Sequence, residues 1–131
     1  MYLARNIQWR GESLEAVGAI PADVVVGERP QGRGYMLLEE TGKNPWPNPP
    51  GSQTVENTPI AVHEFHYARL ENLGDDPIFV NRVLRGTGID GAHDGLIVDN
   101  IVAGFAHHRN TQTNPWVERF VSFVRKNRPK K

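Results

Sequence analysis

Residues 95–109 constrain the fold more than any other stretch of the sequence, because they contain two short apolar runs and the second run is followed directly by polar residues. The polar pair Asp99-Asn100 separates the two runs, which predicts two antiparallel strands around a tight turn, with the second strand over residues 101–106. His107 then stands where a strand gives way to a loop. Such a position fixes a side chain and leaves it reachable, so His107 is a candidate catalytic residue; a capping or surface histidine is the ordinary alternative.

The composition excludes several classes of function. Lys plus Arg and Asp plus Glu both number 15, so the net charge of zero implies no general attraction to nucleic acid or to an anionic membrane. The 131 residues contain no cysteine, which excludes a disulfide, a Cys-ligated metal and a thiol nucleophile within them. No apolar run approaches the length of a membrane span and no signal-peptide pattern is visible, so the expected location is the cytoplasm.

The remaining elements follow from alternation and from helix-start signals. Residues 1–7 are compatible with a helix, and β-rich or alternating patterns predict strands over residues 17–20, 23–26, 35–39, 60–70 and 77–85. Asn114 is expected to cap a C-terminal helix that has Pro115 at its first position. The apolar stripe of that helix is expected to be core, and it consists of Trp116, Phe120, Phe123 and Val124. No repeat and no second domain is visible.

Two connecting segments carry proline or glycine signals. Residues 41–59 are rich in proline, which removes main-chain donors, so this stretch is expected to be a surface loop. Gly32-Arg33-Gly34 presents main-chain N–H groups that suit an anion, but no helix follows it. A turn is therefore the preferred interpretation of that segment.

The stretch His63-Glu64-Phe65-His66 has a composition that suits zinc. The metalloprotease motif, however, needs its two histidines one helical turn apart, whereas a strand sends His63 and His66 to opposite faces. His63, Phe65 and Tyr67 would then share one face. We therefore expect no stoichiometric zinc here, with one face buried and the other polar.

A glycine-rich turn before the hairpin places Asp90, His93 and Asp94 close together in sequence. These side chains would form a metal or catalytic cluster only if the loop folded so that they converge. Aspartates in such turns usually accept hydrogen bonds from the main chain two residues later, so Asx-turns are the preferred interpretation.

Several long stretches of the chain, taken in order, resemble one family. They are MYLARNI at residues 1–7, ERPQGRGY at 28–35, HEFHYARL at 63–70, RGTGIDGAHDGL at 85–96 and NPWVERFVSFVR at 114–125. Together they are similar to the C-terminal part of the cobyrinate a,c-diamide synthases. The resemblance includes relatives that amidate sirohaem-type tetrapyrroles in sulfur-metabolising bacteria, and it runs over nearly the whole chain.

This resemblance implies the C-terminal part of a class I glutamine amidotransferase-like domain, an α/β fold with a mostly parallel sheet, here as several strands plus a C-terminal helix. In the family a cysteine thiolate hydrolyses glutamine, and the ammonia attacks an acetate side chain activated by ATP and magnesium in an N-terminal P-loop module. The nucleophile sits in a Cys-Gly-Gly-Leu segment before the position of Met1. Residues 1–131 are therefore expected to be a partial domain that starts just after that segment.

The resemblance also implies roles for individual residues. His107 falls where the family carries the histidine that activates the cysteine. Arg109 stands where ordinary class I amidotransferases have a glutamate, so a dyad is implied in place of a triad. His63, Glu64, His66 and Arg109 are weak candidates for substrate binding. No metal or cofactor is expected to bind to this chain itself.

Two hypotheses remain open at this point. The chain is a fragment or subunit of a glutamine-hydrolysing ligase, whose chemistry needs an N-terminal portion with the cysteine and the ATP module. Alternatively, it is a stand-alone, non-catalytic remnant that binds a tetrapyrrole, glutamine or a protein partner. The first hypothesis predicts exposed strand edges and self-association, because part of the sheet would be missing. Neither hypothesis identifies the tetrapyrrole or the carboxylates that react.

Overall fold

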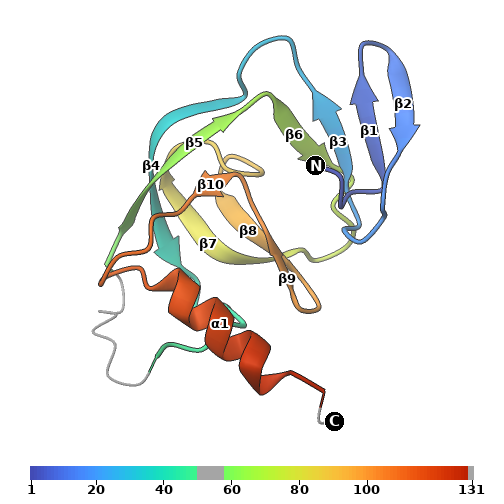
Figure 1. Ribbon diagram of the computed structural model, residues 1–131. Coiled ribbons are helices and arrows are strands. Elements are labelled where there is room, and N and C mark those ends of the chain that lie inside the picture. The colour runs from blue at the N-terminus through green and yellow to red at the C-terminus, as the bar shows by residue number, and fades with distance from the viewer. Residues whose placement is uncertain (50–57, 130–131) are drawn as a thin grey trace.

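The computed structural model describes residues 1–49 and 58–129, and strands dominate this part of the chain. The sequence-based expectation of several strands plus a C-terminal helix is confirmed (Figure 1). In chain order the elements are β1 Asn6–Trp9, β2 Glu12–Glu15, β3 Asp23–Val26, β4 Gly32–Glu40, β5 Ile60–His66, β6 Ala68–Glu71, β7 Ile78–Arg85, β8 His93–Val98, β9 Ile101–Ala103, β10 Ala106–His107 and α1 Trp116–Lys126.

The strands form two sheets that share a corner. The smaller sheet has the order β2-β1-β3-β6 and the larger one the order β10-β5-β4-β7-β8-β9. Strands β5 and β6 follow one another with Tyr67 between them, so the chain passes from one sheet to the other at this residue (Figure 1).

Most strand pairs in the described residues are antiparallel. Of the pairs formed there, β1 with β3 is the parallel one. The mostly parallel sheet implied by the family resemblance is therefore not found in these residues. Parallel neighbours need long crossover connections, usually helical, whereas β7, β8 and β9 follow one another through short turns.

Strand β5 alternates as its sequence predicts. His63 and Phe65 are exposed, while Glu64 and His66 are buried on the opposite side. Because side chains alternate along a strand, the two histidines of the zinc-like stretch face opposite sides of the sheet, as expected.

The hairpin of β8 and β9 is present, but its second strand is shorter than predicted. β8 and β9 pair antiparallel around a turn in which Asp99 has a φ of 50°. The predicted single strand over residues 101–106 was wrong: pairing with β8 stops at Ala103, and β10 pairs with β5 instead. His107 nevertheless ends a strand, β10, as predicted.

A buried carboxylate explains the break between β9 and β10. Asp94 is 1% exposed and accepts hydrogen bonds from the main-chain N–H groups of Phe105 and Ala106, at 3.0 and 3.1 Å. Gly104 lies so close to this carboxylate that a Cβ atom there would clash with an Asp94 oxygen. Any side chain at residue 104 would displace Asp94, so the glycine permits this close contact where the chain leaves β9.

In the described residues the core consists of three apolar clusters, and residues 105 and 106 between them contact all three. Phe105 packs against the first two clusters and its ring stacks on His66 at 3.9 Å, while Ala106 packs against the third. The buried members are Ile20, Ala22, Phe79, Ile89 and Leu96 in the first, Ala4, Val24 and Ala68 in the second, and Met36, Leu38 and Val62 in the third.

Two expectations for the first part of the chain were wrong. Residues 1–5 form turns and bends instead of a helix, because β1 begins at Asn6 and pairs with both β2 and β3. Residues 17–20 form no strand, since their N–H groups bond to the turn at Tyr2, Leu3 and Ala4. The strand predicted over residues 23–26 is β3.

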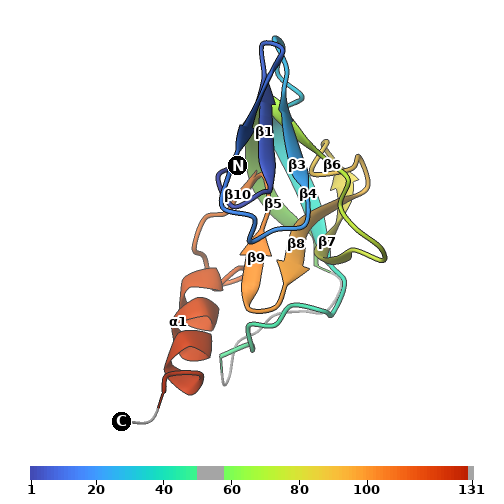
Figure 2. The same ribbon diagram turned by 90° about the vertical axis from the view of Figure 1, so that its right-hand side faces the viewer.

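Helix α1 differs from its predicted capping and burial. Pro115 occupies the N-cap position, and the Asn114 amide donates to His108 and to the main-chain oxygen of Arg109. Asn110 takes the capping role predicted for Asn114, because its Oδ1 accepts from the main-chain N–H of Val117 at 3.1 Å. Phe120 and Val124 of the predicted core stripe are exposed, whereas Arg119 is buried. The helix lies at the end of the molecule opposite the β1–β2 hairpin (Figures 1 and 2), so its apolar side does not meet the main core.

The proline-rich segment is only partly described. Residues 41–49 and 58–59 contain no helix or strand, in agreement with the predicted loop, and residues 50–57 of that segment lie outside the described residues. Within the described chain, no helix is long and apolar enough to cross a membrane.

Replacing the Asp94 carboxylate tests the cause of the strand break. We expect Asp94→Ala to lower the free energy of unfolding by about 2 to 4 kcal/mol, because two partly buried main-chain N–H groups lose their acceptor. Urea denaturation measures this change, and Asp75→Ala in an exposed loop is the matched control. Hydrogen exchange at Phe105 and Ala106 should accelerate in the first variant only; unchanged exchange there would contradict the assignment.

Candidate functional site

The predicted catalytic histidine lies on an exposed face of the larger sheet. His107 ends β10 directly opposite His63 of β5, and the centroids of the two imidazole rings are 5.8 Å apart. The ring of Tyr35, from β4, meets His63 edge-on at 6.2 Å. We call these three side chains the outer histidine cluster. All three are exposed, so a reactant that approaches this face from solvent can reach His107.

The other predicted site residues do not join this cluster. Glu64 is buried and accepts hydrogen bonds from the N–H groups of Thr87 and Gly88, at 2.8 and 3.0 Å, so it fixes a loop. His66 lies beside it, with its Nε2 atom 3.4 Å from Glu64. Arg109 is exposed in the loop that precedes α1. Of the weak substrate-binding candidates, only His63 therefore lies beside His107.

The loop of Asp90, His93 and Asp94 folds as Asx-turn chemistry predicts. Asp90 accepts hydrogen bonds from the N–H groups of Ala92 and His93, at 2.8 and 2.6 Å, while Asp94 points to residues 105 and 106 instead. Within residues 1–49 and 58–129, no group of three or more His, Cys, Asp or Glu side chains is arranged to hold a metal ion.

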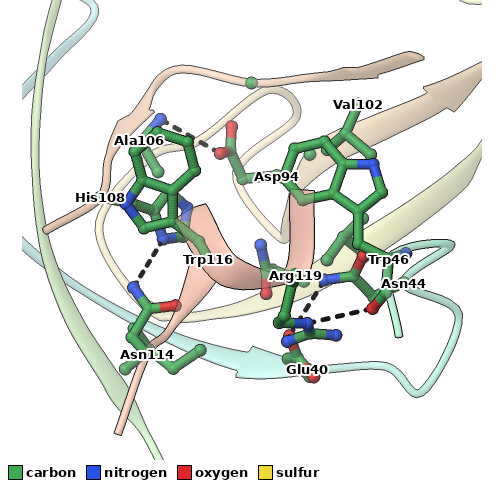
Figure 3. Close-up of a pocket in the computed structure, with 15 residues that line it drawn as sticks. Glu40, Asn44, Trp46, Asp94, Val102, Ala106, His108, Asn114, Trp116 and Arg119 are labelled. Atoms are coloured by element: carbon green, nitrogen blue, oxygen red, sulfur yellow. Dashed lines mark hydrogen bonds and ion pairs between the residues drawn. The ribbon is translucent and has the colours of Figure 1, made fainter. Parts of the chain in front are cut away.

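A pocket of about 280 Å³ lies on the other side of the sheet, between the strands and helix α1 (Figure 3). We call it the inner pocket. His108, not His107, lines it, because successive side chains of an extended chain point in opposite directions. The lining residues are Glu40, Asn44, Trp46, Ile60, Val80, Asn81, Asp94, Gly95, Val102, Gly104, Ala106, His108, Asn114, Trp116 and Arg119.

An ion pair closes one side of the inner pocket. Arg119, which is 5% exposed, donates from Nη1 to Glu40 at 2.5 Å and from Nε to the main-chain oxygen of Trp46 at 3.0 Å. The Asn44 amide donates to the same oxygen of Glu40 at 3.2 Å. The charges of Arg119 in α1 and Glu40 in β4 therefore neutralise each other. The contacts of Arg119 attach α1 to β4 and to the loop after it.

Two titratable groups of the pocket have shifted pKa values. Burial lowers the pKa of the His108 imidazole, and the carboxylate of Glu40 acts in the opposite direction. The Asn114 amide donates to His108 Nδ1 at 3.1 Å, so the neutral ring carries its proton on Nε2. Burial raises the pKa of Asp94, and the N–H groups of Phe105 and Ala106 oppose that shift.

Three residues that line the inner pocket each have a buried polar atom with no hydrogen-bond partner among the described residues. These atoms are the indole nitrogens of Trp46 and Trp116 and the side-chain oxygen of Asn81. The sequence pattern identified none of these three residues, nor Arg119, as part of a site. Alternation along β7 could have identified Asn81 as buried, but nothing in the sequence indicates that the loop, the helix and the sheet meet.

Comparison with known proteins identifies relatives with one shared name, while no family model matches the sequence. The chain is 38% identical over 95% of its length to the cobyrinate a,c-diamide synthase of Magnetococcus marinus, covering 25% of that protein. It is 31% identical over 92% of its length to the Archaeoglobus fulgidus protein of that name, covering 25% of it. For the Haloarcula marismortui protein the identity is 34% over 74% of the chain, which covers 20% of that relative.

The chain is similar over most of its length to the cobyrinate a,c-diamide synthases. It spans about a quarter of the length of the curated relatives that it matches over most of its own length. The resemblance predicted from the sequence motifs is thus confirmed, and the family is one of enzymes named as synthases.

Replacing Arg119 tests how much the ion pair of the inner pocket contributes to stability. We expect Arg119→Met to lower the free energy of unfolding by about 3 kcal/mol, because it leaves Glu40 partly buried without its cation. Adding Glu40→Gln should restore part of the loss, since the remaining amide carries no charge. Thermal and urea unfolding measure both effects. Arg125→Met, in the exposed last turn of α1, is the control, and equal losses in the two arginine variants would refute the structural role.

Proposed function

We propose that the chain acts as a C-terminal fragment or subunit of an ATP-dependent, glutamine-hydrolysing enzyme of the cobyrinate a,c-diamide synthase type. Such an enzyme amidates acetate side chains of a tetrapyrrole, either cobyrinate or a sirohaem-type compound. The observation that carries this proposal is homology over 95% of the chain to a synthase of that name. The glutamine amidotransferase-like assignment of the fold is part of the same proposal.

The catalytic role proposed for His107 rests on its position. A neutral imidazole at the end of a strand can accept the proton of a thiol and return it to the leaving amine. His107 is exposed at the end of β10, with the imidazole of His63 beside it. The sequence contains no cysteine, so the proposed thiol must come from residues outside these 131.

The proposal includes partners that the chain would need. An N-terminal portion would supply the cysteine, and a P-loop module would bind ATP and magnesium to activate the carboxylate of the tetrapyrrole. Glutamine would provide the ammonia. The chain itself would contribute His107 and its rigid support, in which β10 pairs with β5 and Asp94 fixes the residues just before the histidine.

The alternative is a non-catalytic, stand-alone remnant that binds a tetrapyrrole or a protein partner. The exposed apolar face of helix α1 favours a protein partner, because contiguous apolar surface commonly marks an interface. This face consists of Val117, Phe120, Val121 and Val124. The two proposals differ in whether any glutamine hydrolysis depends on His107.

A chimeric enzyme tests the proposed catalytic role. The present sequence would replace the homologous quarter of the Magnetococcus marinus synthase, and glutamate release would be measured with glutamine, ATP, magnesium and tetrapyrrole. We expect His107→Ala to reduce the rate by about 10² to 10⁴-fold, the usual contribution of a general acid–base group. The isolated chain should release no glutamate, because it lacks a thiol.

His93→Ala serves as the matched control in the chimera. His93 hydrogen-bonds to Asp90 in a loop and contacts none of the outer histidine cluster, so its replacement should leave the rate unchanged. Equal rates for the His107→Ala and parent chimeras would overturn the catalytic role. Glutamate release by the isolated chain well above that of its own His107→Ala variant would overturn the need for a second portion.

Self-association of the isolated chain is a further part of the proposal. We expect the exposed apolar face of α1 to associate with other copies of the chain. The double change of Val121→Lys and Val124→Lys should therefore increase the monomer fraction measured by sedimentation velocity. Lysine retains helix propensity, so helicity should be preserved. Ser122→Lys adds charge outside this face and should have no effect; a monodisperse parent chain would contradict the proposal.

A further inference from the structure

We propose that His63 and His107 of the outer histidine cluster together bind one late first-row divalent cation, such as Zn²⁺ or Cu²⁺, through their imidazole nitrogens. The two residues lie side by side because β10 pairs with β5. The zinc-like stretch of the sequence joins His63 to His66 instead, and those side chains face opposite sides of the sheet. The proposal therefore departs from the expectation that this chain binds no metal, since the pair forms only on folding.

The separation of the two rings suits a shared ion. A zinc ion at about 2.0–2.1 Å from a ring nitrogen lies roughly 3.2 Å from the centre of that ring, so one ion can join rings whose centres are up to about 6.4 Å apart. Tetrahedral angles at the ion bring the centres to about 5.2 Å. The observed distance is 5.8 Å, and both side chains are exposed, so a small rotation of either ring is sufficient.

The two imidazoles are held in place by their strands. His63 lies between Tyr35 of β4 and His107 of β10, each directly opposite it on a neighbouring strand. The Tyr35 ring meets the His63 ring edge-on at 6.2 Å. The residue before His107 is fixed by the Asp94 carboxylate, which accepts from the N–H of Ala106. Binding therefore orders few side chains that are not already placed, which lowers its entropic cost.

The available donor atoms select the class of cation. Imidazole nitrogens suit Zn²⁺, Cu²⁺ and Ni²⁺, whereas Mg²⁺ and Ca²⁺ require oxygen ligands. Glu64 is the carboxylate between the two strand histidines, but it lies on the buried side and accepts from the N–H groups of Thr87 and Gly88. Two histidines on an exposed face leave the other coordination positions of the ion to water. The site therefore discriminates against hard cations.

Imidazole signals in NMR spectra provide a direct test. The sequence has five histidines, and His66 and His108, whose side chains lie away from the outer face, serve as internal references. Zn²⁺ alone would be titrated into the chain labelled at histidine, in a buffer that does not bind metal. We expect the ring signals of His63 and His107 to shift with one common midpoint and to saturate at one ion per chain. Mg²⁺ should shift neither signal.

Reciprocal variants distinguish one shared ion from two separate contacts. His63→Gln should raise the Zn²⁺ midpoint of the His107 signal about tenfold or more, and His107→Gln should do the same for His63, because the second ligand of one ion acts at a high effective concentration. His93→Gln, at the start of β8, should leave both midpoints unchanged. An unchanged His66 signal, from a ring stacked on Phe105, verifies the fold of each variant.

Two results of this titration would overturn the proposal. One is a different midpoint for each ring in the parent chain. The other is an unchanged midpoint for either ring when the opposite histidine is replaced. Either result would mean that the two imidazoles meet metal independently, as any exposed histidine can.

The site also implies inhibition, and this step alone rests on the proposed function. A cation on His107 would occupy the lone pair that accepts the thiol proton, so it should stop glutamine hydrolysis. In the chimera, with free Zn²⁺ set by a metal buffer, His63→Gln should raise the inhibiting concentration about tenfold. Equal inhibition of both chimeras would overturn the link to catalysis. An inactive parent chimera would count against the proposed function, while the titration of the isolated chain decides the binding.

Discussion

The structure depends on one buried carboxylate. Asp94 lies in β8 and accepts hydrogen bonds from the main-chain N–H groups of Phe105 and Ala106. This contact turns the chain away from the β8–β9 hairpin toward β5. Phe105 then fills the space between two core clusters and stacks on His66. Burial disfavours the charged form of Asp94, so the two N–H groups have to offset part of that cost. The larger sheet gains its edge strand through this arrangement.

The same contact divides two adjacent histidines between two environments. Ala106 is fixed with its side chain inward, so His107 points outward beside His63, and His108 enters the inner pocket. One imidazole is exposed and the other has its pKa lowered by burial. Strand β10 pairs with β5 through Ala106 and His107. This short pairing is sufficient to separate the two histidines, because successive side chains of a strand point to opposite faces of the sheet.

The sequence predicted elements whose pattern is local and missed features that depend on distant contacts. Alternation identified the faces of β5, and the turn at Asp99 identified the β8–β9 hairpin. The break at Gly104 was missed because it depends on Asp94, ten residues earlier in the chain. The inner pocket was missed for a similar reason, since Trp46, Asn81 and Trp116 belong to a loop, a strand and a helix. His107 was located at a strand end from sequence, whereas its catalytic role comes from the family resemblance.

Helix α1 explains why a pocket exists at all. An amphipathic helix normally buries its apolar stripe, which would bring it into close contact with the sheet. Here Arg119 is the buried residue, and it attaches to Glu40 and to the main chain of Trp46, while Phe120 and Val124 stay exposed. A contact through a long charged side chain leaves space beside it that apolar packing would have filled. The indoles of Trp46 and Trp116 line that space, which lies between the helix, the sheet and the loop after β4.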